Sequence, residues 1–138
     1  MPHHALFARL SAVRRVAFHG RGRGWTRCGA GTVLVENISN NILLFHECLQ
    51  LDGKQRSRDC KRWCLQDGGL LLLQRRRHHG WETIFAFARK RDAWHSKAFY
   101  CAPDGYFGSL HPTDAGIELR VRVCGTGKDD VLKSVYAE

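Results

Sequence analysis

The stretch that decides the fold class is Ile117-Glu118-Leu119-Arg120-Val121-Arg122-Val123-Cys124. Apolar side chains occupy every second position, and charged side chains stand between them. This period of two is typical of a β-strand that turns one face to a core and the other to water. We therefore expect its four apolar side chains to point into the core of an all-β protein.

Seven further segments on either side of this stretch show strand-like patterns bounded by turn-forming residues. Asp67-Gly68-Gly69 is the strongest hairpin signal among the turns. The eight expected strands are Thr32–Glu36, Ile42–Leu51, Arg58–Gln66, Leu70–Arg76, Trp81–Ala88, Trp94–Tyr100, Ile117–Cys124 and Val131–Tyr136.

Most connections between these segments are too short for a parallel crossover, so neighbouring strands must pair antiparallel. The longest connection, Pro103 to Pro112, is expected to be a loop. Eight meandering strands remove their exposed edges when the sheet closes on itself. The sequence thus predicts an eight-stranded antiparallel up-and-down barrel of lipocalin-like shape with a short N-terminal helix.

Length and composition fit one domain of this kind. The chain has 138 residues, of which 43% are hydrophobic and 25% are charged, which is enough for a single core. The longest apolar run, Ile84 to Ala88, is far shorter than the roughly 18 residues of a membrane-spanning helix. No transmembrane segment is expected.

Residues 1–25 differ in character from the rest of the chain. Leu6, Leu10 and Val13 recur at helical spacing, arginines stand between them, and the first acidic residue is Glu36. An Arg-rich start without acids is typical of mitochondrial targeting segments, and equally of a helix that caps the domain. We expect a basic helix or arm over 1–25, with Gly20 to Gly24 as a flexible joint, and a barrel domain over 26–138.

The net charge of +9 raises the question of a nucleic-acid partner. Two basic clusters, Arg75–Arg77 and Arg89–Arg91, flank one expected strand and should therefore lie at opposite ends of the barrel. No single basic face is predicted, so a nucleic-acid partner is an alternative and not the first expectation.

Six cysteines are present, but no apolar signal-peptide core precedes them. We expect free thiols in a reducing, intracellular compartment, cytoplasmic or mitochondrial. Cys60 and Cys64 lie on one face of an expected strand, roughly 13 Å apart at about 3.3 Å per residue, too far to share a tetrahedral zinc ion. No metal site and no cofactor are expected.

The C-terminal third carries a motif that can be compared with a family. Cys101-Ala-Pro103-Asp104-Gly-Tyr106, then Val123-Cys-Gly125-Thr-Gly-Lys128-Asp129 and Ser134-Val-Tyr136, resemble the C-terminal signature of a small domain family of unknown function, known mainly from bacterial proteins. The resemblance implies a lipocalin-like, calycin-type barrel. Within these motifs we expect structural loop roles for Asp104, Tyr106, Lys128 and Asp129.

Polar residues inside expected strands are the candidates for a site. Alternate positions from Leu43 to Leu51 place Glu47 in an apolar row. A buried carboxylate is costly, so Glu47 needs a partner such as an arginine or the Tyr136 hydroxyl, or must be neutral with a raised pKa. Ser134 and Tyr136 should face inward on the closing strand.

These residues give two interpretations of the barrel interior. In the first, the polar end of a ligand meets Glu47, Ser134 and Tyr136, while Trp63, Phe85 and Phe87 form apolar walls. In the second, the polar groups satisfy one another as an internal plug.

Three function classes follow from this sequence. The first is a non-catalytic module that binds a small, mainly apolar or amphipathic ligand with a polar or anionic end. The second is an interaction subunit whose basic arm docks onto RNA or an acidic partner. The third is an enzyme with its site in the barrel. None of the eight histidines lies in a recognisable motif with a nucleophile. Gly125-Thr-Gly127 lacks the third glycine of a dinucleotide fingerprint. The ligand-binding module is therefore the first expectation.

Overall fold

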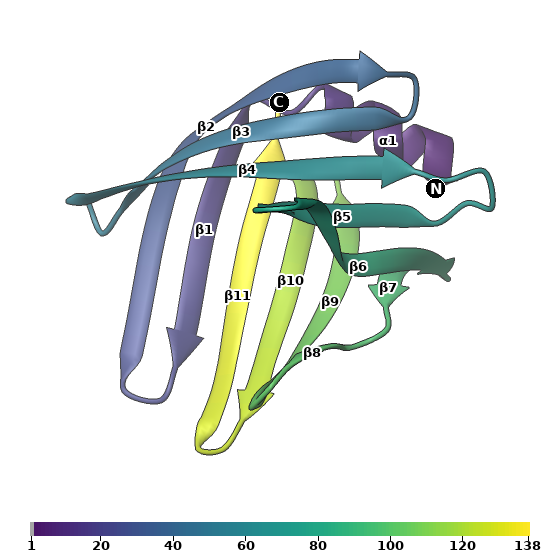
Figure 1. The fold of residues 1–138 in the computed structure, drawn as a ribbon. Coiled ribbons are helices and arrows are strands. Elements are labelled where there is room, and N and C mark those ends of the chain that lie inside the picture. Colours follow the sequence, from purple (N-terminus) through teal and green to yellow (C-terminus); the bar gives the residue numbers. More distant parts are fainter. Residues whose placement is uncertain (1) are drawn as a thin grey trace.

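The computed structural model describes residues 2–138, which form one helix and eleven strands (Figure 1). The helix is α1 (His3–Ser11). The strands are β1 (Arg15–Gly22), β2 (Trp25–Ser39), β3 (Ile42–Leu51), β4 (Gln55–Leu65), β5 (Leu71–Arg77), β6 (Gly80–Lys90), β7 (Ala93–Ser96), β8 (Phe99–Cys101), β9 (Asp104–Thr113), β10 (Gly116–Gly125) and β11 (Lys128–Ala137).

The strands form one sheet that closes on itself. From β1 to β7 each strand pairs with the next, β7 then pairs with β9, β9 with β10, β10 with β11, and β11 with β1. Ten strands therefore complete the ring, and β8 pairs with one end of β9 as an additional strand. Each of these pairings is antiparallel. The protein is an antiparallel β-barrel with one short helix.

The expectation of eight strands was wrong in number. Strands occur at all eight expected places, but Trp94–Tyr100 is divided into β7 and β8, and two strands were missed. β1 was missed because glycine stands at Gly20 and Gly22, where an apolar inward residue would have completed the alternation. β9 was interpreted as a loop because it contains Gly105, Gly108 and Pro112, residues typical of turns.

Gly108 has a packing reason to be glycine. A Cβ built on it would lie 2.9 Å from atoms of the Phe85 ring, closer than real contacts allow. Phe85, which is 3% exposed, therefore packs directly over the backbone of β9. Gly108 made β9 look like a loop in the sequence, and the same glycine allows β9 to pack against Phe85.

The division expected at residue 25 falls at the start of β2, and a strand of the barrel, β1, lies before it. Residues 15–22 form β1, which closes the barrel between β11 and β2, and the expected flexible joint forms the hairpin between β1 and β2. The expected helix is present as α1 and packs on the barrel through Leu6, Phe7 and Leu10. The basic segment is part of the folded domain.

Arginines of this segment bond to backbone carbonyls. Arg9 donates to the Thr113 carbonyl at 2.7 Å, and Arg15 donates to the Glu138 carbonyl at 2.8 Å. Arg14 donates to the Val13 carbonyl at 2.7 Å. The bonds of Arg9 and Arg15 connect the N-terminal segment to the barrel, and the bond of Arg14 is local to the segment.

Fully buried aliphatic side chains fill the barrel end that α1 covers. Leu6, Leu10, Leu43, Leu110 and Ile117 are at most 1% exposed there. The central layer contains large aromatic side chains, and in it Phe45 lies edge-on to both Trp63 and Tyr136. One end of the barrel is thus closed by the helix and by its own side chains.

The expected inward face of Ile117–Cys124 is confirmed. Ile117, Leu119 and Val123 are buried, and Val121 is half-buried against the core. Arg120 and Arg122 are exposed on the outer face.

The two basic clusters lie at opposite ends of β6, as expected. Among residues 2–138, α1 is the one helix, and it falls short of the length and apolarity required to cross a membrane.

Candidate functional site

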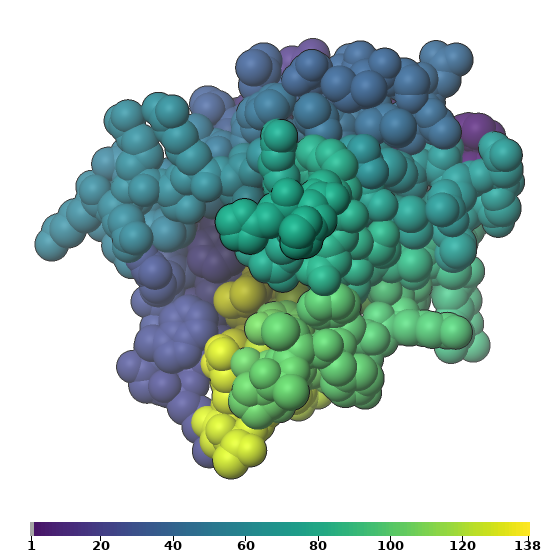
Figure 2. Space-filling model, viewed as in Figure 1, coloured from purple at the N-terminus to yellow at the C-terminus, as the bar shows by residue number. Residues whose placement is uncertain are grey.

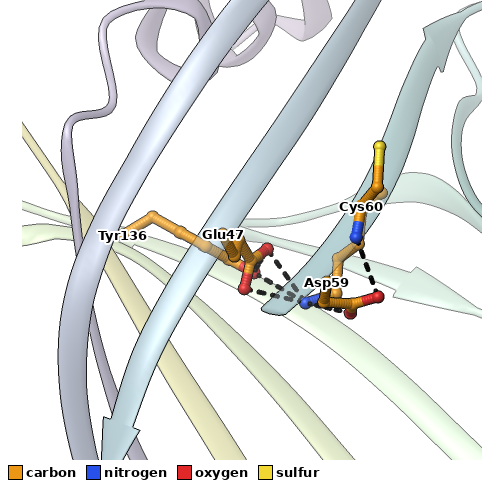
Figure 3. Close-up of polar contacts among 5 residues, drawn as sticks. Glu47, Asp59, Cys60 and Tyr136 are labelled. Atoms are coloured by element: carbon orange, nitrogen blue, oxygen red, sulfur yellow. Dashed lines mark hydrogen bonds and ion pairs between the residues drawn. The ribbon is translucent and has the colours of Figure 1, made fainter. Parts of the chain in front are cut away.

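The main polar feature inside the barrel is a cluster of Glu47, Lys61, Asp59 and Tyr136 (Figure 3). Glu47 comes from β3, Asp59 and Lys61 from β4, and Tyr136 from β11. Alternation along β3 and β4 puts Glu47 and Lys61 on the inner face, one layer beyond the aromatic pair Phe45 and Trp63. We call these four residues the floor cluster, because they separate the packed half of the barrel from its open half.

The floor cluster satisfies its own hydrogen bonds. Lys61 Nζ lies 3.0 Å from Glu47 Oε1 and 2.9 Å from Glu47 Oε2, and the Tyr136 hydroxyl donates to Glu47 Oε2 at 2.8 Å. Lys61 Nζ also lies 3.3 Å from Asp59 Oδ2. An ammonium group has three N–H donors, and the two Glu47 oxygens and the Tyr136 hydroxyl, at 3.4 Å, accept from them.

Glu47 has two partners, of which one was expected and one was not. The Tyr136 hydroxyl does bond to Glu47, which is 3% exposed. The cationic partner is Lys61 and not an arginine. A visible signal marked Lys61: it stands two residues before Trp63, on the same face of the same strand. We had not considered Lys61.

The environment raises two pKa values in the floor cluster. For Lys61, burial alone would lower the pKa, but the phenolic oxygen of Tyr136 and the carboxylates of Glu47 and Asp59 outweigh burial and raise the pKa above its usual range. For Tyr136, burial is the largest cause of a raised pKa; Lys61 opposes the shift and Glu47 reinforces it. At neutral pH the cluster holds an ammonium and a neutral phenol.

This protonation state bears on the enzyme interpretation. A lysine nucleophile requires a lowered pKa so that the free amine is populated. The pKa of Lys61 is shifted in the opposite direction. The geometry therefore suits structure and binding better than attack on a substrate.

Three residues expected as ligand walls lie in the packed layer. Trp63 and Phe87 are 0% exposed and stack with ring centroids 6.3 Å apart, and Phe85 contacts Phe87 at 5.6 Å. The Trp63 indole N–H has no acceptor among the described residues. In this structure the three side chains pack against one another behind the floor cluster.

Beyond the floor cluster the inner face becomes accessible. Half-buried inward positions continue along the strands, with Leu49 on β3, Val121 on β10, and Leu132 and Ser134 on β11. Figure 2 shows a hollow on this side, between the teal-blue β3–β4 hairpin, the slate-blue β1–β2 hairpin and the yellow β11. This accessible half of the interior is called the open half below.

Apolar side chains converge in the open half around one glycine. A Cβ built on Gly20 would lie 3.0 Å from the Phe18 ring, 3.1 Å from Leu132 and 3.1 Å from the Trp25 ring. Gly20 has no side chain, so these three groups can gather on the inner face of β1, β2 and β11. They form a half-buried apolar wall.

The structure thus brings together only part of the predicted site. Glu47 and Tyr136 are in contact, and Ser134 lies one inward position further toward the open half. Asp59 and Lys61, which we had not predicted, complete the polar group. The apolar wall beside the open half comes from Phe18, Trp25 and Leu132.

The four residues expected in structural loops lie instead at the beginnings of two strands, Asp104 and Tyr106 in β9 and Lys128 and Asp129 in β11, beside the β10–β11 turn. Lys128 Nζ is 3.3 Å from Asp104 Oδ2, which links this turn to the start of β9. Asp129 pairs with Arg122 across the hairpin at 3.0 Å. Tyr106 faces inward and packs 6.1 Å from Phe99. They connect strands at the rim of the barrel.

Cys60 and Cys64 lie on the outer face of β4, because Trp63 and Lys61 between them point inward. The six cysteines are unpaired in the structure. Within residues 2–138, no group of three His, Cys, Asp or Glu side chains is arranged to hold a metal ion.

Comparisons with known proteins add a likeness of shape. No family model matches the chain, and no curated protein matches it. Among solved structures, it is similar to a de novo designed fluorescence-activating β-barrel, with 10% sequence identity and a TM-score of 0.48. The similarity covers 94% of this chain and 96% of the designed one.

Proposed function

We propose that the protein is a non-catalytic binding module for a small, mainly apolar ligand that enters the open half of the barrel. The observation that carries the proposal is the contrast between the two halves. Apolar side chains are fully buried on the α1 side, whereas Phe18, Trp25, Leu49 and Leu132 remain partly accessible beyond the floor cluster. Partly exposed apolar side chains on a concave surface gain free energy when an apolar group covers them.

The polar end of the ligand should meet Asp59 and Ser134. The donors of Lys61 are already directed to Glu47 and the Tyr136 hydroxyl, whereas the Asp59 side chain is 50% exposed and retains acceptor positions. A hydroxyl or ammonium end therefore fits better than a carboxylate, which would have to compete with Glu47 for Lys61. This refines the expectation of a polar or anionic end.

The charges around the floor cluster balance one another, so a neutral hydrogen-bond donor fits beside Asp59. Glu47 and Asp59 contribute two negative charges, and Lys61 and the exposed Arg75 opposite it on β5 contribute two positive charges. A carboxylate placed beside Asp59 would meet a like charge, and repulsion disfavours it. A hydroxyl group forms its bond without adding charge.

The test uses Nile red, a neutral dye whose emission shifts to the blue in apolar surroundings. Dodecanol, dodecylamine and dodecanoate, which differ only in the polar end, then compete for the dye. We expect binding of the dye, with dodecanol and dodecylamine displacing it at lower concentration than dodecanoate. Asp59→Asn removes a negative charge and should therefore reduce the advantage of dodecylamine over dodecanoate.

A matched pair of variants locates the dye. Leu132→Trp fills the open half, whereas Val131→Trp adds the same bulk on the outer face of the same strand. Loss of dye binding only in Leu132→Trp, with circular dichroism unchanged in both, supports the proposal. Absence of dye binding in the folded wild-type protein, or equal loss in both variants, contradicts it.

A further inference from the structure

A second surface, on the outside of the barrel, is independent of the open half. It comprises the outward residues of β4, β5 and β6, three strands that lie side by side (Figure 1). The outward positions include four arginines and one tryptophan and no acidic residue; they are Arg56, Arg58, Arg62, Arg76 and Trp81. We call these five residues the outer arginine patch.

The centre of the outer arginine patch is a stack of side chains. The Arg62 guanidinium lies 4.9 Å from the centroid of the Trp81 ring, and the Arg76 guanidinium lies 5.8 Å from it. Both distances are within the range of cation–π contacts. Trp81 is half-buried and Arg76 is exposed, so the stack is accessible from solvent.

A network beneath the stack holds Arg62 in place. The Arg62 Nε–H donates to Gln74 Oε1 at 2.7 Å, and the Gln74 amide donates to Thr83 Oγ1 at 3.0 Å. Gln74 is only 8% exposed, so this bridge across β4, β5 and β6 is shielded from water. The Nη groups of Arg62 form no ion pair with a carboxylate of the described residues and remain able to bind an anion.

The arginines of the patch are not neutralised by the protein. None of the four forms an ion pair with a carboxylate in residues 2–138, whereas Arg27, Arg77, Arg120 and Arg122 elsewhere do. On β3, the neighbouring strand, the outward residues are again without acids, and Glu36 on β2 is already paired with His46. Uncompensated positive charge around an aromatic ring is the arrangement that single-stranded nucleic acids bind.

We propose that the outer arginine patch binds single-stranded nucleic acid, with a base stacking on the Trp81 and Arg62 group and phosphates meeting Arg58 and Arg76. The planar stack favours unpaired bases, because bases in a duplex are already stacked on one another. An acidic protein segment would use the charges but gain nothing from the ring. The proposal does not depend on a ligand in the open half.

The experiment measures fluorescence anisotropy of a labelled single-stranded RNA of about 12 nucleotides, within the site sizes of such proteins. The same RNA as a duplex and polyglutamate serve as competitors. We expect the single strand to bind most tightly, and its affinity to fall steeply between roughly 50 and 200 mM salt. A duplex or polyglutamate that competes equally well overturns the proposal.

Two variants and a control separate stacking from charge. Trp81→Leu keeps the charge and should weaken RNA binding about tenfold, as loss of one stacked base would. The double variant R62Q/R76Q removes two charges from the patch and should weaken it at least as much. The control R120Q/R122Q removes two charges from β10, away from the patch, and should change affinity by less than about threefold. Equal losses in both double variants would show an effect of net charge alone and overturn the proposal.

A measurement on the wild-type protein covers the case in which Trp81→Leu does not fold. Ultraviolet cross-linking of the bound RNA, followed by peptide mapping, should place the cross-links in β4, β5 or β6. Cross-links confined to β9, β10 or β11 overturn the proposal.

Discussion

At the scale of single residues, the contact between Glu47 and Lys61 shows how the sequence supports a buried charge. Each charge is costly alone inside a protein, and the pair is tolerated because every donor and acceptor finds a partner. The bidentate contact at 2.9 and 3.0 Å and the Tyr136 bond at 2.8 Å supply those partners. The pair is therefore sensitive to the loss of either member.

We expect Lys61→Met to destabilise the fold by about 3 kcal/mol, since it leaves the Glu47 carboxylate buried beside Tyr136 alone. The double variant E47L/K61M should recover much of this loss, because it removes both charges. Urea denaturation gives both free energies of unfolding. If the double variant loses as much free energy of unfolding as Lys61→Met and Glu47→Leu lose together, the two residues are not coupled and the prediction is contradicted.

The raised pKa values predict a loss of stability at alkaline pH. The folded protein holds the protons of Lys61 and Tyr136 more tightly than the unfolded chain does. Their contribution to stability is complete below the ordinary pKa of tyrosine and lysine, about 10, and is lost as the pH rises above it. Tyr136→Phe should therefore show a shallower decline in stability over this range. Urea denaturation at a series of pH values measures the two slopes, and equal slopes would contradict the assignment.

The sequence predicted this site only in part, for a reason visible in the residues. Glu47 interrupts an apolar row, and Tyr136 shares one face of the last strand with Leu132 and Ser134, so alternation marked both as inward-facing. Asp59 and Lys61 lie in the run Arg58-Asp59-Cys60-Lys61-Arg62, where charged residues on both faces hide the period of two. Counting back from Trp63 places Lys61 and Asp59 on the inner face, but their contacts with Glu47 and Tyr136 depend on how β4 pairs with other strands, which the sequence pattern does not show.

At the scale of elements, strands with clean alternation were found correctly, and strands that contain glycine for packing were not. β10 was predicted from its pattern, whereas β9 was missed because Gly108 accommodates the Phe85 ring. A glycine that a neighbouring side chain requires is indistinguishable in sequence from a glycine that ends a strand. The pairing of β9 with β7 and β10, which closes the barrel, therefore could not be predicted from the sequence.

On β10 we expect the effect of an acidic substitution to follow burial. Leu119→Asp should cost about 3 kcal/mol or more, because Leu119 is 5% exposed and a carboxylate there has no partner. Val121→Asp should cost less, because Val121 borders the open half. Arg120→Asp should cost about 1 kcal/mol or less, since it removes a surface ion pair with Glu118. Thermal midpoints give the order, and an equal fall for Leu119→Asp and Arg120→Asp would refute the assigned faces.

Helix α1 should contribute to the barrel and not act as a detachable arm. Leu10 is 0% exposed, so Leu10→Ala should destabilise the protein by about 3 kcal/mol. Ala8→Ser, on the exposed side of the same helix, is the control and should cost under about 1 kcal/mol. Urea denaturation measures both free energies, and a Leu10→Ala variant as stable as the control would indicate that the helix undocks at no cost.

At the scale of the whole molecule, the barrel wall is uneven in strength. Ten residue pairs join β3 to β4, but only four join β6 to β7 and only two join β7 to β9. β8 adds three pairs to β9. The division of one expected strand into β7 and β8 thus leaves a seam in which few ladder hydrogen bonds hold the ring closed.

Local opening should therefore begin at this seam. Amides with few ladder partners and little buried apolar surface open at the lowest free energy. We expect hydrogen exchange of the peptide over residues 93–103 to precede that of β2, β3 and β4. If a ligand passes through the seam, Nile red should slow exchange there more than in β3 and β4. The measurement is hydrogen–deuterium exchange by mass spectrometry with and without the dye. Exchange in residues 93–103 as slow as in β3 would show that the closing contacts Trp94–Leu110 and His95–Ser109 hold the wall as firmly as a complete ladder.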